Sequence, residues 1–232
     1  MHEPPPADND TGGLDRDVIE HARALMERGP RQLLGIVGAP GAGKSTLAET
    51  LVSALGPAAQ LLPMDGYHLS NRELQRLARS ERKGAPDTFD AHGYLALLQR
   101  LRTPRAGETV YAPGFYRDIE EPIAASIGVP PSVRLVVTEG NYLLLDHAPW
   151  SAIADTLDET WYLHVDPPLR RQRLVARHVR FGRSPPAARD WVASVDEPNA
   201  ALIAASRPRA SRVLTWQDGP DARFVPDTDP AS

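Results

Sequence analysis

An apolar run that leads directly into a glycine-rich turn is the feature that most constrains this chain. The run LLGIV at residues 33–37 is followed by GAPGAGKST at residues 38–46. The turn fits the spacing G-x-x-x-x-G-K-[ST], whose backbone N–H groups face the phosphates of a nucleotide. The match is carried by Gly38, Gly43, Lys44 and Ser45.

The segment that follows supports a phosphate-binding interpretation of this turn. KSTLAETLVSAL at 44–55 has the pattern of a helix and is stopped by Gly56-Pro57. A strand, a loop and a helix in this order are the structural context that the motif requires. We therefore expect the phosphates of a nucleotide to be bound by Gly38, Ala39, Pro40, Gly41, Ala42, Gly43, Lys44, Ser45 and Thr46. A hydrolase, a switch and a kinase all remain open at this point.

Bulk composition limits the class of protein. The 232 residues are 41% hydrophobic and 24% charged, which suits one globular domain. A net charge of -4 argues against a nucleic-acid partner, because such proteins usually carry a basic excess. The absence of cysteine excludes disulfides, thiolate nucleophiles and cysteine-based zinc sites. The N-terminus has no secretory pattern and no apolar run approaches the ~18 residues of a membrane span, so we expect a cytoplasmic protein without a membrane partner.

Apolar runs that alternate with helical patterns predict the fold. Such alternation implies right-handed βαβ units, so we expect a three-layer α/β/α P-loop NTPase fold around a mostly parallel, five-stranded sheet. The five expected strands lie within 31–37, 58–65, 132–140, 158–166 and 211–216. Helical patterns cover 14–29, 44–55, 70–80, 90–102 and a stretch after Asp166. The segment 108–131 is expected to be a short strand followed by irregular chain, where an acceptor site could be built.

The same patterns predict the domain organisation. We expect a disordered tail over 1–13, a single P-loop domain over 14–220 and a C-terminal tail over 221–232. Within the domain, an Arg-rich helical lid is expected at about 167–190.

Two carboxylates follow predicted strands, at the edge where parallel sheets bind ligands. Asp65 follows the second run and is the candidate general base, although an Asp-Gly turn explains the same residues. Glu139 ends the third run, and we expect it to hold Mg²⁺ together with the hydroxyl of Ser45; the alternative is an acidic strand end facing solvent. Lys44 supplies a point charge for the phosphates.

Six arginines lie between Arg170 and Arg183, without an acidic residue among them. Four of these arginines fall on one face of a helix that begins at two prolines, which favours a lid closing over phosphates; a solvated basic face is the alternative. The candidate catalytic residues are Asp65, Lys44, Arg173 and Arg177. The candidate substrate-binding residues are Asp65, Tyr67, His68, Lys83 and Arg117, of which His68, Lys83 and Arg117 could equally be structural or decorate the surface.

Four stretches beyond the phosphate loop carry a family resemblance. They read MDGYHLSN, RKGAPDTFDAHGYLALLQRL, VYAPGFYRDIEEP and VVTEGNYLLL, in that order. Over residues 33–216 the chain resembles the P-loop kinases that include uridine kinase, phosphoribulokinase and type I pantothenate kinase. The resemblance implies that Asp65 is the base and that Glu139 serves Mg²⁺. The chain is shorter than pantothenate kinase and differs from it at GFYRDIEEP, and is more similar to bacterial nucleoside or sugar kinase-like members, some labelled fructose transport system kinases.

The expected function is therefore transfer of the γ-phosphate of ATP, with Mg²⁺, to a hydroxyl of a small molecule such as a nucleoside, a sugar, pantothenate or glycerate. A GTPase switch or metallochaperone is the main alternative, although the guanine-reading Asn-Lys-x-Asp motif is absent. A nucleoside-monophosphate kinase and a nucleotide-binding partner protein without activity are further alternatives. The resemblance also makes a homodimer reasonable.

Overall fold

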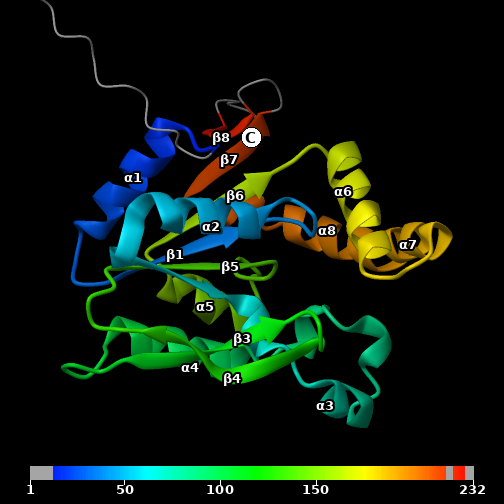
Figure 1. Ribbon diagram of the computed structural model, residues 1–232, viewed down its shortest axis with the longest axis horizontal. Helices are drawn as coiled ribbons and strands as arrows, with labels where there is room; N and C mark the ends of the chain where they lie inside the picture. Colours follow the sequence, from blue (N-terminus) through cyan, green and yellow to red (C-terminus); the bar gives the residue numbers. More distant parts are fainter. Residues whose placement is uncertain (1–12, 218–221, 228–232) are drawn as a thin grey trace, which may run out of the picture.

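A computed structural model describes residues 13–217 and 222–227 of the chain (Figure 1). Its main sheet has the strand order β2-β5-β1-β6-β7-β8. The strands are β1 (Gln32–Val37), β2 (Ala59–Pro63), β5 (Leu135–Gly140), β6 (Glu159–His164), β7 (Arg212–Gln217) and β8 (Arg223–Pro226). The first five pair in parallel, and only β8 runs antiparallel to its neighbour. The expected α/β fold with a mostly parallel sheet is thus confirmed.

The sixth strand, β8, differs from the predicted five-stranded sheet. It lies within 221–232, where we expected a tail, and it pairs with β7 from Leu214↔Pro226 to Gln217↔Arg223. The N-terminal part of the described chain joins the same edge, because Asp15 N donates to Phe224 O at 2.9 Å and Phe224 N donates to Gly13 O at 2.9 Å. The tail expected over 1–13 lies, except for Gly13, outside the described residues.

Helices cover both faces of the sheet, which gives three layers (Figure 1). One face packs against α1 (Arg16–Met26) and α2 (Lys44–Leu55), and the other packs against α4 (Ala91–Arg102) and α5 (Trp150–Thr156). Side chains of a strand alternate between faces. In β1, therefore, one set of apolar side chains enters the core beneath α2 and the other enters the core beneath α4.

The excursion between α4 and β5 is more regular than expected. Instead of one short strand and irregular chain, β3 (Val110–Tyr116) and β4 (Glu121–Val129) form an antiparallel hairpin with a register shift between Ala112 and Gly114. Before α4, the short helix α3 (Asn71–Arg76) lies within the helical pattern expected over 70–80, and turns of 3-10 helix (Ser80–Arg82 and Pro86–Thr88) follow it. The hairpin and α3 lie on the same side of the sheet (Figure 1).

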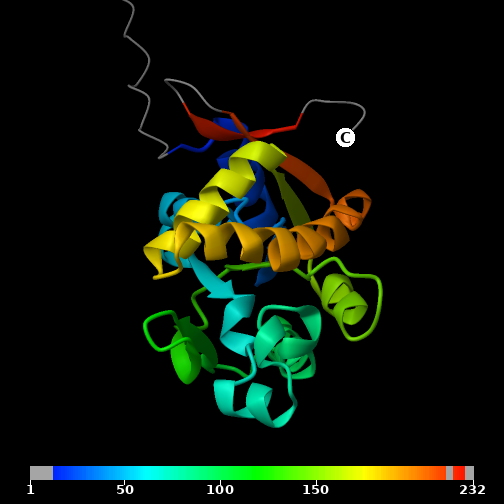
Figure 2. The ribbon, with the colours of Figure 1, turned by 90° about the vertical axis from the view of Figure 1, so that its right-hand side faces the viewer.

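The Arg-rich segment forms helices at the end of the molecule toward which the parallel strands point (Figures 1 and 2). They are α6 (Pro167–Arg180), α7 (Pro185–Trp191), a π-helical segment (Val192–Asp196) and α8 (Glu197–Ala204). As the two prolines predict, α6 begins at Pro167. Over residues 13–217 and 222–227, no helix combines the length and the apolar character that a membrane crossing requires.

Candidate active site

The phosphate loop connects β1 to α2 with two glycines in the left-handed region. Gly41 has φ +81° and Gly43 has φ +94°, and residues other than glycine rarely adopt these backbone conformations. Gly41 also allows close packing, because a Cβ there would lie 2.7 Å from Cγ of Leu174 on α6. Gly43 caps α2 without a side-chain hydrogen bond, so the first N–H groups of the helix remain available to an anion.

Lys44 is buried at the start of α2 with its ammonium in the loop. Its Nζ donates to Asn141 Oδ1 at 2.7 Å and to Ala39 O at 3.3 Å. Burial lowers the pKa of Lys44, while the carboxylates of Glu139 and Asp65 partly oppose this effect. An ammonium held by two neutral oxygens is well placed to turn toward phosphate. Sequence reasoning missed Asn141, although it stands two residues after Glu139.

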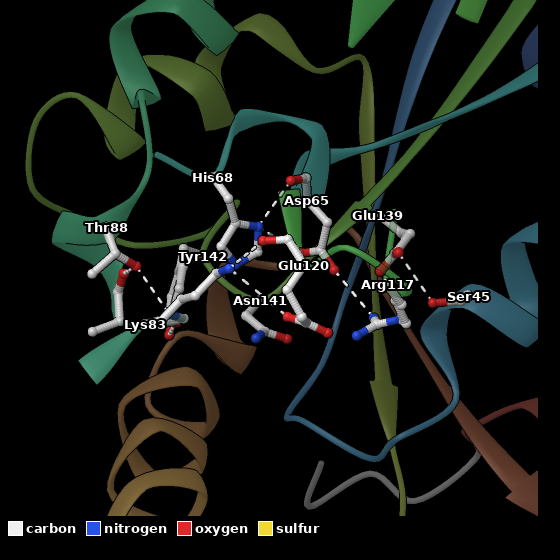
Figure 3. A network of polar contacts seen from close by, with 12 residues as sticks. Ser45, Asp65, His68, Lys83, Thr88, Arg117, Glu120, Glu139, Asn141 and Tyr142 are labelled. Carbon is white, nitrogen blue, oxygen red and sulfur yellow. Dashed lines mark hydrogen bonds and ion pairs between the residues drawn. The ribbon is translucent and has the colours of Figure 1, made fainter. Parts of the chain in front are cut away.

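Ser45 and Glu139 form an oxygen pair beside the loop (Figure 3). Ser45 Oγ donates to Glu139 Oε1 at 3.1 Å. Burial raises the pKa of Glu139, and Lys44 is the largest opposing influence. A buried carboxylate next to a hydroxyl and a phosphate cradle suits a hard cation such as Mg²⁺, which binds oxygen ligands and retains several waters. The residues present therefore fit a magnesium ion.

Asp65 lies just beyond β2, in the helical turn Met64–Tyr67. Pro63 at the end of β2 is in register with Glu139 on β5, so both carboxylates reach the same sheet edge. Oδ2 of Asp65 lies 3.4 Å from Nη2 of Arg117, which arrives from the β3–β4 connection (Figure 3). Asp65 also influences the pKa of Lys44 and of Glu139 by its charge, so the three groups share one electrostatic environment.

A cavity of about 450 Å³ opens between the sheet edge and the Arg-rich helices. The phosphate loop contributes Pro40, the residue directly after β5 is Asn141, and the turn after β2 contributes Asp65. The other residues that line the cavity form two walls. The hairpin wall lies next to the β3–β4 hairpin, and the lid wall lies on the helices from α6 to α8. The candidate base and the phosphate loop therefore line a single cavity.

The hairpin wall is aromatic and contains His68. The ring centroid of His68 lies 4.0 Å from that of Phe89 and 4.8 Å from that of Phe115. Its Nδ1 lies 2.8 Å from the backbone carbonyl of Asp65, and since a carbonyl only accepts, this nitrogen carries the proton. Burial lowers the pKa of His68, although the nearby Asp65 opposes the effect.

Lys83 lines the same wall but is already well bonded (Figure 3). Its Nζ donates to Asn71 Oδ1 at 2.7 Å and to Glu120 O at 2.5 Å, and lies 5.3 Å from the ring centroid of Phe115. These bonds connect Lys83 both to the start of α3, at Asn71, and to the tip of the hairpin, at Glu120. They give Lys83 a structural role in this wall of the cavity. Tyr67 differs from the other candidates, because it packs against Tyr94 at 5.1 Å and is not among the cavity's lining residues.

The lid wall brings Arg177, His178 and Asp196 to the cavity. His178 Nε2 and Asp196 Oδ2 lie 2.8 Å apart, and Asp196 ends the π-helical segment. The guanidinium of Arg183 lies 3.9 Å from the ring centroid of Trp191. Arg177 remains solvent-accessible, and within residues 13–217 and 222–227 its side chain has no hydrogen bond or ion pair. The sequence pattern indicated the arginines but not the histidine–aspartate pair.

The arginines of α6 have separate environments. Arg170 is buried and bonds to Pro40 O at 3.2 Å and to Glu197, so it attaches the helix to the phosphate loop. Arg173 lies on Trp216 rather than in the cavity. The first turns of α6 are therefore packed against the phosphate loop. Arg177 is the first arginine along this helix that lines the cavity.

The phosphate loop between a parallel strand and a helix, with a carboxylate at the neighbouring strand end, defines a P-loop nucleotide-binding protein. No protein-family model matches the chain. It is 36% identical over 175 residues to "Putative uridine kinase C227.14" of Schizosaccharomyces pombe, an alignment that covers 72% of this chain and 74% of that protein. It is 40% identical over 152 residues to "ATP-dependent kinase-like protein notR'" of Aspergillus versicolor, covering 62% of this chain and 88% of that protein.

A solved structure agrees with these relatives. The crystal structure of a "putative fructose transport system kinase" from Silicibacter sp. TM1040 has a TM-score of 0.77 at 36% identity, covering 86% of this chain and 98% of that chain. The chain therefore belongs to the family of uridine kinase-like P-loop kinases. The resemblance read from the sequence is confirmed.

Proposed function

We propose that the protein transfers the γ-phosphate of ATP to a hydroxyl group of a small molecule bound in the cavity between the hairpin and the lid. The observation that carries this proposal is the position of Asp65, which lines the same cavity as the phosphate loop and Asn141, the partner of Lys44. The names of the relatives as ATP-dependent and uridine kinases support ATP as the donor and a small molecule as the acceptor.

The phosphoryl donor would lie in the loop from Gly38 to Thr46. Its N–H groups and the N-terminus of α2 favour the β- and γ-phosphates, and Lys44 exchanges its two oxygen partners for phosphate oxygens. Ser45 and Glu139 would hold Mg²⁺. When bound, the ion neutralises charge on the β- and γ-phosphates.

Asp65 would accept the proton of the acceptor hydroxyl. Arg117 lies beside this carboxylate, and Arg177 approaches from the lid, where the charges of Arg117 and Asp65 both act on its guanidinium. The two cations repel each other while Asp65 attracts both, and a phosphoryl anion bound between them would add further attraction. We therefore assign Arg117 and Arg177 to the transferring phosphoryl group, which carries the charge of the transition state.

The acceptor would occupy the space between the aromatic hairpin wall and the lid. Phe115 and Trp191 offer apolar surface, whereas His178, Asp196 and Asn199 offer polar groups on the lid. The loop carrying Lys83 is held in place by Tyr142, whose hydroxyl donates to Gly84 O at 2.5 Å. The segment that carries Lys83 is thus attached to the chain just after β5.

An ATP-consumption screen tests the proposal. Purified protein with ATP and Mg²⁺ is incubated with single nucleosides, hexoses, pantothenate or glycerate, and ADP is measured against a sample without acceptor. We expect at least one compound to stimulate ADP formation and to become phosphorylated in equal amount. ADP formation that no compound stimulates, together with strong selectivity for GTP, would favour the switch or metallochaperone alternative.

A further inference from the structure

The cavity is lined by more cationic than anionic side chains. Its lining includes three carboxylates, Asp65, Glu120 and Asp196. Each carboxylate lies within 3.8 Å of a basic side chain, which is Arg117, Lys83 and His178 in the same order. Over residues 13–217 and 222–227, the two other cations of the lining, Arg177 and Arg183, have no ion pair. Two positive charges of the cavity are therefore left for bound anions.

These two arginines differ in their surroundings. The guanidinium of Arg177 shares the electrostatic environment of Asp65 and Glu139, and the proposed function assigns it to the transferring phosphoryl group. Arg183 lies six positions further along the chain, beyond the end of α6, and its guanidinium carbon lies over the ring of Trp191. Arg183 is thus the cation of the lining that neither a described carboxylate nor the transferring group neutralises.

Arg183 is held in place through its backbone and through its side chain. Gly182, with φ +96°, follows the end of α6 in the left-handed conformation, and N of Arg183 donates to O of His178 at 3.0 Å. The distance of 3.9 Å to the ring centroid of Trp191 is that of a close cation–π contact. A guanidinium that is already stacked on an aromatic ring loses little rotamer freedom on binding, and its planar fork fits two oxygens of one carboxylate or phosphate.

We propose that the acceptor carries an anionic group, a carboxylate or a phosphate, apart from the hydroxyl that is phosphorylated, and that Arg183 binds this group. Trp191 is then a positioning residue that holds the guanidinium at the lid wall. The inference rests on the proposed function, because it specifies the acceptor of the same cavity. Hydroxy acids and sugar phosphates are the matching substrate classes, whereas a neutral nucleoside or free sugar would leave the charge of Arg183 without a counter-ion.

Matched pairs of acceptors test this inference with the full chain, ATP and Mg²⁺. The pairs are glycerate with glycerol, pantothenate with pantothenol, and ribose 5-phosphate with ribose, and uridine is added as a neutral nucleoside. The members of a pair differ chiefly in the anionic group, and the carboxylate pairs are separate from the phosphate pair, so the preferred kind of anion is also identified. We expect the highest kcat/KM for an anionic compound, exceeding that of its neutral partner about tenfold or more.

Variants at the lid then test the assignment to Arg183. Arg183→Gln should lower kcat/KM for the preferred acceptor about tenfold, mainly through KM, while the Kd of ADP stays within about twofold. Trp191→Leu should reduce the preference for the anionic compound by a smaller factor, and should not reduce it further in the Arg183→Gln background, because Trp191 acts through Arg183. Arg180→Gln removes the same charge from an exposed position of α6 outside the cavity and is the matched control.

The outcomes separate this inference from the proposed function. A neutral compound with the highest kcat/KM would overturn the inference and leave the proposed function standing. An anionic preference that Arg183→Gln leaves unchanged would overturn the assignment to Arg183, and a further loss of preference in the double variant would overturn the positioning role of Trp191. Failure of every compound to stimulate ADP formation would overturn both proposals.

Discussion

Nη2 of Arg117 lies 3.4 Å from Oδ2 of Asp65, so the candidate base and a candidate phosphate ligand are in direct contact. Arg117 comes from the connection between β3 and β4, and Asp65 comes from the turn after β2. The hairpin therefore places the cation Arg117 beside Asp65, the carboxylate that we assign to proton transfer.

Removing Arg117 should slow the reaction without unfolding the protein. We expect Arg117→Gln to lower kcat by about 10- to 100-fold, because one cation that stabilises the transferring group is lost. Affinity for ADP should stay within about twofold of the unaltered chain. Acceptor-dependent ADP formation measures the effect, and Arg23→Gln, which removes an exposed charge on α1, is the control. An unchanged kcat would contradict the assignment of Arg117.

Arg31 should be important for stability although it lies outside the site. Its buried guanidinium donates to Val133 O at 2.9 Å, Pro130 O at 2.7 Å and Leu101 O at 3.4 Å, and so connects the start of β1 to the end of α4 and to the chain between β4 and β5. Arg31→Met removes the guanidinium donor from these carbonyls, of which Pro130 O still accepts from the N–H of Val133 at 3.1 Å, and should lower the free energy of unfolding by about 3 kcal/mol. Urea denaturation measures it, with Arg23→Met as control; a loss no larger than the control's would refute this role.

Glu159 should make stability depend on acid pH. Burial raises the pKa of Glu159, but hydrogen bonds from Trp161 and His21, with the charges of His21 and Arg28, together lower it below the ordinary 4.5. A carboxyl whose pKa is lower in the folded state contributes stability above its unfolded pKa and loses this contribution as pH falls through the folded value. We expect Glu159→Gln to cost about 1–3 kcal/mol near pH 7 and progressively less below pH 4.5.

Denaturation at several pH values measures this dependence, with Glu49→Gln, an exposed substitution on α2, as the control. A constant difference between the unaltered chain and Glu159→Gln from pH 7 to pH 3.5 would show that the charge of Glu159 is irrelevant to stability.

Parts of this structure that depend on local pattern could be predicted from the sequence. The strand, loop and helix around Lys44 follow from an apolar run, a motif and a helix stop, and the rule for parallel sheets places Asp65 and Glu139 at one edge. β8 could not be predicted, because four residues ending in a proline carry little pattern and because they pair with distant segments, namely β7 and the chain around Leu14. The exclusion of Tyr67 from the cavity depends on its packing against Tyr94, a contact between segments that no local signal reveals.

The contacts of the lid side chains could not be predicted from local sequence pattern either. Helical spacing placed Arg170, Arg173 and Arg177 on one face, and they do lie on α6. Arg170 contacts Glu197, 27 positions further along the chain, and Arg173 contacts Trp216, 43 positions further along, whereas Arg177 lines a cavity that segments from several parts of the chain form. Asp196 reaches His178 through a π-helical segment, whose extra residue per turn changes which side chains face inward.

The account depends most on Asp65 as the group that accepts the proton of the acceptor hydroxyl. Its most direct test is kcat for acceptor phosphorylation by Asp65→Asn, measured beside the affinity for ADP and beside Asp118→Asn, an exposed aspartate one residue after Arg117. We predict that Asp65→Asn lowers kcat by about 10²- to 10⁴-fold while ADP affinity and the Asp118→Asn control stay near those of the unaltered chain. Turnover by Asp65→Asn within a factor of about three of the unaltered chain would contradict the account.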